Sequence, residues 1–163
     1  MIRALAVLGF SLAFGLAAHA GGPGVFQFEP DARDALHLLW SSSLASRAER
    51  VACLAGVIEG DTVRVLRILP LVATGGDSLG ISAKASLEAC GPPSWQGTVH
   101  THIAMRAGQR PYSSFSGADR GVMLMWGQRW KATGIFCVLF SSEQAHCELD
   151  GIDGSLIFPT TQY

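Results

Sequence analysis

The chain combines apolar positions spaced three or four residues apart, as in amphipathic helices, with short apolar runs of strand length. Residues 31–46 carry apolar side chains at helical spacing, from Leu36 to Leu44, and Pro30 stands where a helix begins. The other predicted elements are helices at 82–89 and 117–126 and strands at 51–58, 63–69, 97–102, 135–140 and 145–149. This order predicts one α/β (α+β) domain.

Turns and loops separate these elements. Residues 59–61 and 141–144 each join two neighbouring strands, which predicts two hairpins. Residues 70–80 form an irregular connection in this interpretation. Residues 103–115, rich in Gly, Arg, Pro and Ser, form a long loop.

The N-terminus has the pattern of a secretory signal peptide over residues 1–20. A positive start at Arg3 precedes an apolar stretch and small residues suited to cleavage. A membrane anchor is the alternative, although the apolar stretch is shorter than the roughly 20 residues that span a bilayer. We expect export to the periplasm or cell exterior and no membrane insertion after cleavage. Residues 21–30 would form an N-terminal arm and residues 31–163 the folded domain.

The charge balance argues against a nucleic-acid partner. The chain has 12 basic and 13 acidic residues. Cleavage of the predicted signal peptide would remove one basic residue, Arg3, and no acidic residue. The mature chain therefore has a formal charge of −2. Nucleic-acid-binding domains carry a basic patch or stripe, and this sequence contains none.

The four cysteines are Cys53, Cys90, Cys137 and Cys147, and none belongs to a C-x-x-C motif. In an exported protein an even number favours disulfides, with three possible pairings. Cys137 and Cys147 flank the turn at 141–144 almost symmetrically, so two antiparallel strands would place them opposite each other. Cys53–Cys90 is then the remaining pair. Four buried free thiols are the alternative.

Five residues carry the candidate chemistry: Glu49, His100, His102, Ser116 and Asp119. His100 and His102 are two positions apart on a predicted strand, so their side chains face the same side. Two histidines and an aspartate can bind zinc and leave its fourth position open. Glu49 could take a proton from a water at that position. Ser116 could hydrogen-bond the oxygen that becomes negative when water attacks a carbonyl.

Each part of this pattern has an ordinary alternative. An H-x-H pair on a strand is often two surface or packed histidines. The sequence from Ser116 to Asp119 resembles the S-x-x-D/E capping box that opens a helix, a role compatible with a site. Glu49 alone could be a solvated glutamate between a helix and a strand.

In combination and in this order, the residues resemble the motifs of the JAMM (MPN-plus) metallopeptidases. Residues 49–56 are similar to the family's glutamate strand, which ends at a glycine. Residues 97–102 are similar to its G-x-x-H-[ST]-H strand, and Ser116-x-x-Asp119 to its motif at a helix start. The resemblance extends over roughly residues 31–150.

This resemblance implies a mixed sheet flanked by helices, with cytidine-deaminase-like layering. It also implies one zinc ion per chain, bound by His100, His102 and Asp119. Glu49 would act as general base and Ser116 as oxyanion donor in the hydrolysis of peptide or isopeptide amide bonds. The substrate would be a peptide, a protein tail or a cell-wall peptide of the cell envelope.

The sequence departs from the family pattern in two places. Ile103 stands where a proline commonly follows the second histidine, and the 103–115 loop is longer than is usual. Arg106 and Arg110 could make this loop a flap that grips a carboxylate, or the loop could be a surface insertion. A non-catalytic MPN-like scaffold is the alternative function, and an exported domain of another fold with accidental histidines is a third.

Overall fold

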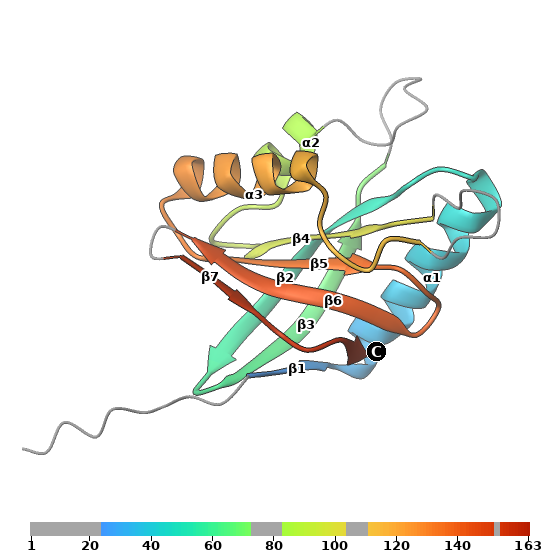
Figure 1. Cartoon of the computed structure of the whole chain (residues 1–163), viewed down its shortest axis with the longest axis horizontal. Helices are drawn as coiled ribbons and strands as arrows, with labels where there is room; N and C mark the ends of the chain where they lie inside the picture. Colours follow the sequence, from blue (N-terminus) through green and yellow to red (C-terminus); the bar gives the residue numbers. More distant parts are fainter. Residues whose placement is uncertain (1–23, 73–82, 104–110, 152–153) are drawn as a thin grey trace, which may run out of the picture.

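The computed structural model describes residues 24–72, 83–103, 111–151 and 154–163. Its elements are β1 (Val25–Phe28), α1 (Pro30–Ser46), β2 (Val51–Glu59), β3 (Thr62–Pro70), α2 (Ala83–Ala89), β4 (Gly97–Thr101), α3 (Gly117–Trp130), β5 (Gly134–Leu139), β6 (Gln144–Gly151), β7 (Gly154–Ile157) and β8 (Thr161–Gln162). The described strands form one mixed sheet flanked by helices, as predicted (Figure 1). None of the described helices is long and apolar enough to cross a membrane.

The order of strands in the sheet places β4 near its centre. The strands lie in the order β1-β3-β2-β4-β5-β6-β7, and β8 pairs with β6. The β1–β3 and β4–β5 pairs are parallel and the other pairs antiparallel. Helix α3 lies between β4 and β5 in the chain, so it belongs to the crossover that a parallel pair needs. The β2–β3 and β5–β6 hairpins confirm both predicted hairpins.

Helix α1 packs on one face of the sheet, called the α1 face below. Leu36, Leu39 and Trp40 are buried at helical spacing and belong to one apolar cluster with Leu54 of β2 and Val99 of β4. Full burial of a side chain such as Leu36 contributes about 1.5–3 kcal/mol to stability. The α1 face is therefore the main hydrophobic core.

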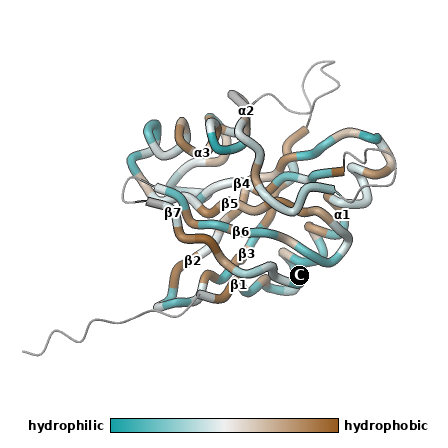
Figure 2. The backbone as a smooth tube through the Cα atoms, viewed as in Figure 1, coloured by the Kyte–Doolittle hydropathy of each residue, from teal (hydrophilic) through white to brown (hydrophobic). Residues whose placement is uncertain are grey.

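Helices α2 and α3 lie over the opposite face, called the α3 face below (Figure 1). Trp126 of α3 packs edge-on against Phe136 of β5 and donates from Nε1 to the Cys90 carbonyl at 3.0 Å. Met123 is also buried, whereas Leu124 is exposed, and Figure 2 shows hydrophilic and hydrophobic segments alternating along α3. Side chains alternate along a strand, so β2, β4, β5 and β6 contribute to both faces.

Both predicted disulfides are present. Cys137 and Cys147 are register partners on β5 and β6 and belong to the core of the α1 face. Cys53 of β2 is bonded to Cys90, which follows α2. The described residues contain no free cysteine. Two disulfides indicate that the protein folds in an oxidising environment.

The arm predicted at residues 21–30 is wrong in part, because Val25–Phe28 forms strand β1 alongside β3. Phe26 and Phe28 point into the core while Val25 and Gln27 are exposed. A strand of four residues is too short for its alternation of buried and exposed side chains to be recognised in the sequence. The glycines that precede it also suggested a linker.

Helix α3 and the C-terminal strands also differ from the predicted boundaries. The helix was expected to stop near Gly127 but continues to Trp130, because Gly127 is buried inside it and Lys131 provides the left-handed C-cap. Strands β7 and β8 were not predicted. Both are short and pair antiparallel with β6, and Gly154 at the start of β7 is the register partner of Gly151.

Some predictions lie outside the described residues. These are the signal peptide at 1–20, the first residue of the helix expected at 82–89, and parts of the segments 70–80 and 103–115. Residues 83–89 form helix α2 as expected.

Candidate metal centre

Strand β4 and the residue that follows it bring His100 and His102 to the α3 face. His100 pairs with Val51 of β2 and Val138 of β5, so it lies in the middle of the sheet. The backbone N–H of His102 donates to the Leu139 carbonyl at 2.8 Å and continues the strand geometry. The two Nε2 atoms are 3.1 Å apart. The predicted same-side arrangement of the two histidines is therefore present.

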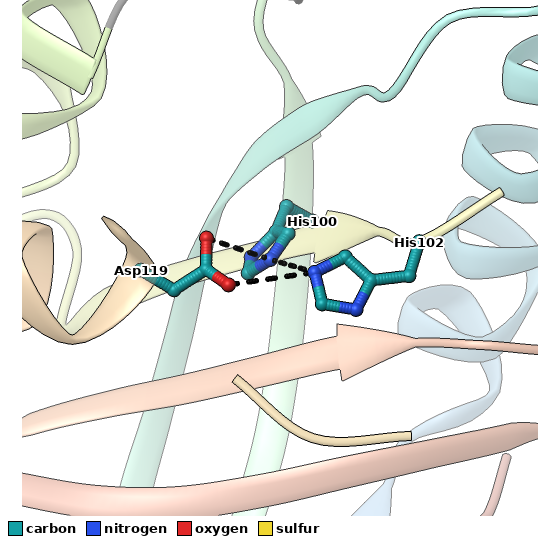
Figure 3. A group of neighbouring side chains, drawn as sticks. All are labelled: His100, His102 and Asp119. Atoms are coloured by element: carbon teal, nitrogen blue, oxygen red, sulfur yellow. Dashed lines mark hydrogen bonds and ion pairs between the residues drawn. The ribbon is translucent and has the colours of Figure 1, made fainter. Parts of the chain in front are cut away.

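Asp119 approaches these rings from the first turn of α3 (Figure 3). Its Oδ1 lies 3.4 Å from His100 Nε2 and its Oδ2 lies 3.4 Å from His102 Nε2. A capping box holds it there: the Ser116 N–H donates to Asp119 Oδ2 at 2.6 Å, and the Asp119 N–H donates to Ser116 Oγ at 3.2 Å. The predicted cap is thus confirmed, and it fixes the aspartate that faces the histidines.

The three donors lie close enough together to hold one metal ion. A tetrahedral zinc with bonds of 2.0–2.1 Å has ligand atoms about 3.3–3.4 Å from one another. The two histidine Nε2 atoms are 3.1 Å apart, and Asp119 meets them through different oxygens, each at 3.4 Å. With one ligand atom from each residue, all three atoms lie within 4.8 Å of one another. His100, His102 and Asp119 are accordingly a group that could hold a metal ion.

A backbone contact fixes the orientation of the His102 ring. His102 Nδ1 lies 2.9 Å from the Tyr112 carbonyl oxygen, which can only accept a hydrogen bond. The proton of a neutral ring is therefore on Nδ1, and the lone pair of Nε2 points toward Asp119. No sequence pattern indicates this contact, because a carbonyl group is present at every residue.

The electrostatics of the group favour a cation between the three side chains. Burial alone lowers the pKa of His102, but hydrogen bonds to Asp119 and Tyr112 and the charge of Glu49 outweigh burial and raise it. Burial alone raises the pKa of Asp119, but hydrogen bonds from His100 and His102 outweigh it and hold that pKa well below its usual range. A metal ion would replace the proton that this arrangement attracts, so binding would release protons.

Glu49 and Ser116 lie in the same cavity as the three donors. The cavity has a volume of about 660 Å³, and its lining includes Glu49, His100, His102, Ser116 and Asp119. Ser116 Oγ accepts the Asp119 N–H, and a side-chain hydrogen bond from Ser116 is one of the interactions that lower the pKa of Asp119. All five residues singled out in the sequence therefore surround one space.

The sequence patterns did not predict a buried charged cluster that lies beside the donors. The side chain of Glu148 on β6 is 0 % exposed and accepts two hydrogen bonds from Arg120. The bond from Arg120 Nη2 measures 2.7 Å, and His146 Nε2 also lies 2.7 Å from the Glu148 carboxylate. Phe115 packs between the rings of His100 and His146. The spacing of His146 and Glu148, two residues apart on a strand, could have indicated this cluster, because it places both side chains on one face of β6. Phe136, the register partner of Glu148 on β5, lies on the same face of the sheet.

The fold and these residues define an α+β protein with a candidate His–His–Asp metal centre on one face of its sheet. No protein-family model matches the chain, and no curated protein matches it. Among solved structures, the chain resembles the solution structure of protein DSY2949 from Desulfitobacterium hafniense. The TM-score is 0.50 and the sequence identity 17%, over 82% of this chain and 88% of that chain. This similarity supports the fold alone.

Proposed function

We propose that the protein is a zinc-dependent hydrolase of peptide or isopeptide amide bonds, an exported member of the JAMM metallopeptidases. The observation that carries the proposal is that His100, His102 and Asp119 each offer a ligand atom, all within 4.8 Å of one another, in a cavity shared with Glu49 and Ser116. Two imidazoles and a carboxylate are a common ligand set of catalytic zinc, which keeps its fourth position open.

Each residue has a distinct part in this reaction. His100, His102 and Asp119 would hold the ion, which polarises a carbonyl and lowers the pKa of a water molecule to about 7. Glu49 accepts the proton of the attacking water and passes it to the leaving amine. The Ser116 hydroxyl donates to the carbonyl oxygen as negative charge develops on it. The products are a carboxylate and an amine.

The compartment narrows the class of substrate. Two disulfides are expected in an oxidising environment outside the cytoplasm, and the signal-peptide pattern of residues 1–20 agrees with export. In the periplasm or outside the cell, the available amide bonds are those of cell-wall peptides, short peptides and the tails of exported proteins.

The first test measures the metal content of the mature protein, residues 21–163, purified without a histidine tag. About one zinc per chain is expected by elemental mass spectrometry, and none in the double variant His100→Ala/His102→Ala. His37→Ala is the matched control, because His37 is exposed on α1, and it should keep the metal. A wild-type protein that takes up no zinc even when zinc is added would favour the MPN-like scaffold instead.

The second test separates catalysis from metal binding. Glu49→Gln should retain zinc and the fold but lose hydrolysis of a peptide substrate by about 10²–10⁴-fold, because the general base is removed. Glu88→Gln is the control, since Glu88 is exposed on α2 and does not line the cavity. Undiminished hydrolysis by Glu49→Gln would disprove the assigned mechanism.

A further inference from the structure

The cavity that holds the three donors continues past them into an apolar space. Its lining also includes Val51, Thr98, Val122, Met123 and Phe136. We call these five residues the side pocket. The cavity also has three charged residues in its lining. Glu49 and Arg50 directly precede β2, and Asp119 lies in the first turn of α3.

The sheet forms the floor of the side pocket. Thr98 is two residues before His100 on β4, so its side chain is on the same face, about 7 Å further along the strand. Phe136 is the register partner of Thr98 on β5, and Val51 is the register partner of His100 on β2. The floor therefore begins directly beside His100 and continues along the strands.

Helix α3 forms the opposite wall. Ala118 and Val122 are four residues apart, as are Asp119 and Met123, so all four lie on the helix face that lines the cavity. One helical turn, about 6 Å, separates the metal-facing Asp119 from Met123. That distance is comparable to the reach of one amino-acid side chain from a peptide bond held at the three donors.

We infer that the side pocket binds the bulky apolar side chain, such as Leu, Met or Phe, of the substrate residue next to the cleaved amide. The inference rests on the proposed function and adds a substrate class to it: peptides with a large aliphatic or aromatic residue beside the scissile bond. Val51 and Val122 are half-buried and line the cavity, with Met123 and Phe136 packed behind them at 3% and 1% exposure, so a side chain that enters meets apolar atoms. A charged side chain would lose its hydration against these apolar atoms.

Two hydroxamic acids test the pocket by binding rather than by hydrolysis. Acetohydroxamic acid and 4-methylpentanohydroxamic acid share the metal-binding group, and only the second has an aliphatic arm. Titration calorimetry on the zinc-loaded mature protein should show the second binding roughly tenfold or more tightly, because the arm is buried. Equal affinities would overturn the side pocket and leave the metal centre in place.

Matched variants on α3 localise the effect. Val122→Phe fills the pocket, and the affinity ratio of the two probes should fall to about one. Ala118→Leu, at an exposed position that also lines the cavity, is a second variant in case the first does not fold. Leu124→Phe is the control, because Leu124 is 59% exposed and points away from the cavity, and it should keep the wild-type ratio. A ratio that stays high in both pocket variants would contradict the inference.

A third measurement distinguishes failure of the pocket from failure of the metal centre. With ¹³C-methyl-labelled methionines, 4-methylpentanamide, which has the arm but no metal-binding group, is added to metal-free protein. The methyl signal of Met123, assigned from Met123→Leu, should shift, while that of Met125, 46% exposed on the outer side of α3, should not. If neither hydroxamate binds but Met123 shifts, the metal chemistry fails and the apolar pocket stands. An unchanged Met123 signal overturns the pocket.

Discussion

Strand β4 sends Val99 and Thr101 to the α1 face of the sheet, and Thr98 and His100 to the α3 face. The α1 face is filled by apolar side chains of α1 and the sheet. The α3 face has a second apolar cluster, but it also holds the cavity, the metal donors and the buried Glu148. One strand thus supplies packing on one side and chemistry on the other, and the alternation of its residues keeps the two apart.

The difference shows where a polar site can be placed in a small domain. Buried polar groups lower stability unless they are hydrogen-bonded, and an open cavity forgoes packing contacts. The α1 face has the large contiguous core, so the α3 face can contain histidines and carboxylates in hydrogen-bonded contact with one another. The following predictions test whether the two faces are energetically and functionally separate, in order of decreasing expected effect.

Each face carries one disulfide, and removing each should have a different effect. Cys53→Ala/Cys90→Ala opens a loop with a sequence separation of 37, and Cys137→Ala/Cys147→Ala one of 10. Loop-closure entropy then gives losses in the free energy of unfolding of about 4 and about 3 kcal/mol, measured by urea denaturation. Only the first pair ties α2, whose Ser86 lines the cavity, to the sheet, so only its removal should weaken the preference for the aliphatic hydroxamate. A larger loss from the second pair would contradict the loop-entropy argument.

Substitution of Glu148 tests the buried charge of the α3 face. Glu148→Gln removes the charge that pairs with Arg120 and His146 and should lower the free energy of unfolding by about 2 kcal/mol. The loss is smaller than for a fully buried pair because the Arg120 side chain is 41% exposed and can be rehydrated. Glu88→Gln, at an exposed position, should change stability by less than about 0.5 kcal/mol. Equal stability of the two variants would show that the buried pair contributes nothing.

The contribution of Glu148 should also depend on pH. Burial alone raises the pKa of Glu148, but hydrogen bonds from Arg120 and His146 outweigh burial and lower it below the ordinary value of 4.5. A lowered pKa in the folded state adds stability above the unfolded pKa, and that stability is lost as pH falls through the folded pKa. The difference in free energy of unfolding between wild type and Glu148→Gln should therefore narrow below about pH 4.5. A gap that widens toward low pH would have the wrong sign for this explanation.

The sequence predicted the elements that have long or repeated patterns. Helix α1 and the two hairpins follow from apolar spacing and turn residues, and the disulfide pairing follows from the near symmetry of Cys137 and Cys147 about one turn. Strands β1, β7 and β8 have two to four residues, too few to establish a period. Their positions depend on pairing with distant strands, which the local sequence does not specify.

The site was predictable where spacing alone places a side chain. His100 and His102 face one side because they are two residues apart on a strand, and Asp119 is fixed by the capping box with Ser116. Two other features depend on tertiary packing, which spacing does not predict. These are the contact of His102 with the Tyr112 carbonyl and the position of α3 against β4, which forms the cavity wall. The role of zinc and the assignment of Glu49 as base stay predictions until metal content and hydrolysis are measured.

The smallest predicted effect tests the separation of the faces most directly. Thr101 lies between His100 and His102 in sequence, but its hydroxyl is 2.6 Å from that of Ser43 on α1. Ser43→Ala removes this buried hydrogen bond while Thr101 Oγ1 still accepts the Arg50 N–H at 2.9 Å. The free energy of unfolding should fall by about 1 kcal/mol, and the zinc affinity should stay the same.

Ser41→Ala is the matched control for this variant, because Ser41 is exposed on α1 and its hydroxyl bonds only to the carbonyl one turn earlier among the contacts described. It should leave both stability and zinc affinity nearly unchanged. A tenfold loss of zinc affinity in Ser43→Ala would mean that the α1 face positions the histidines. Alternation along β4 would then join the two faces rather than insulate them, and the hydrogen bond between Ser43 and Thr101 would be part of the support of the metal centre.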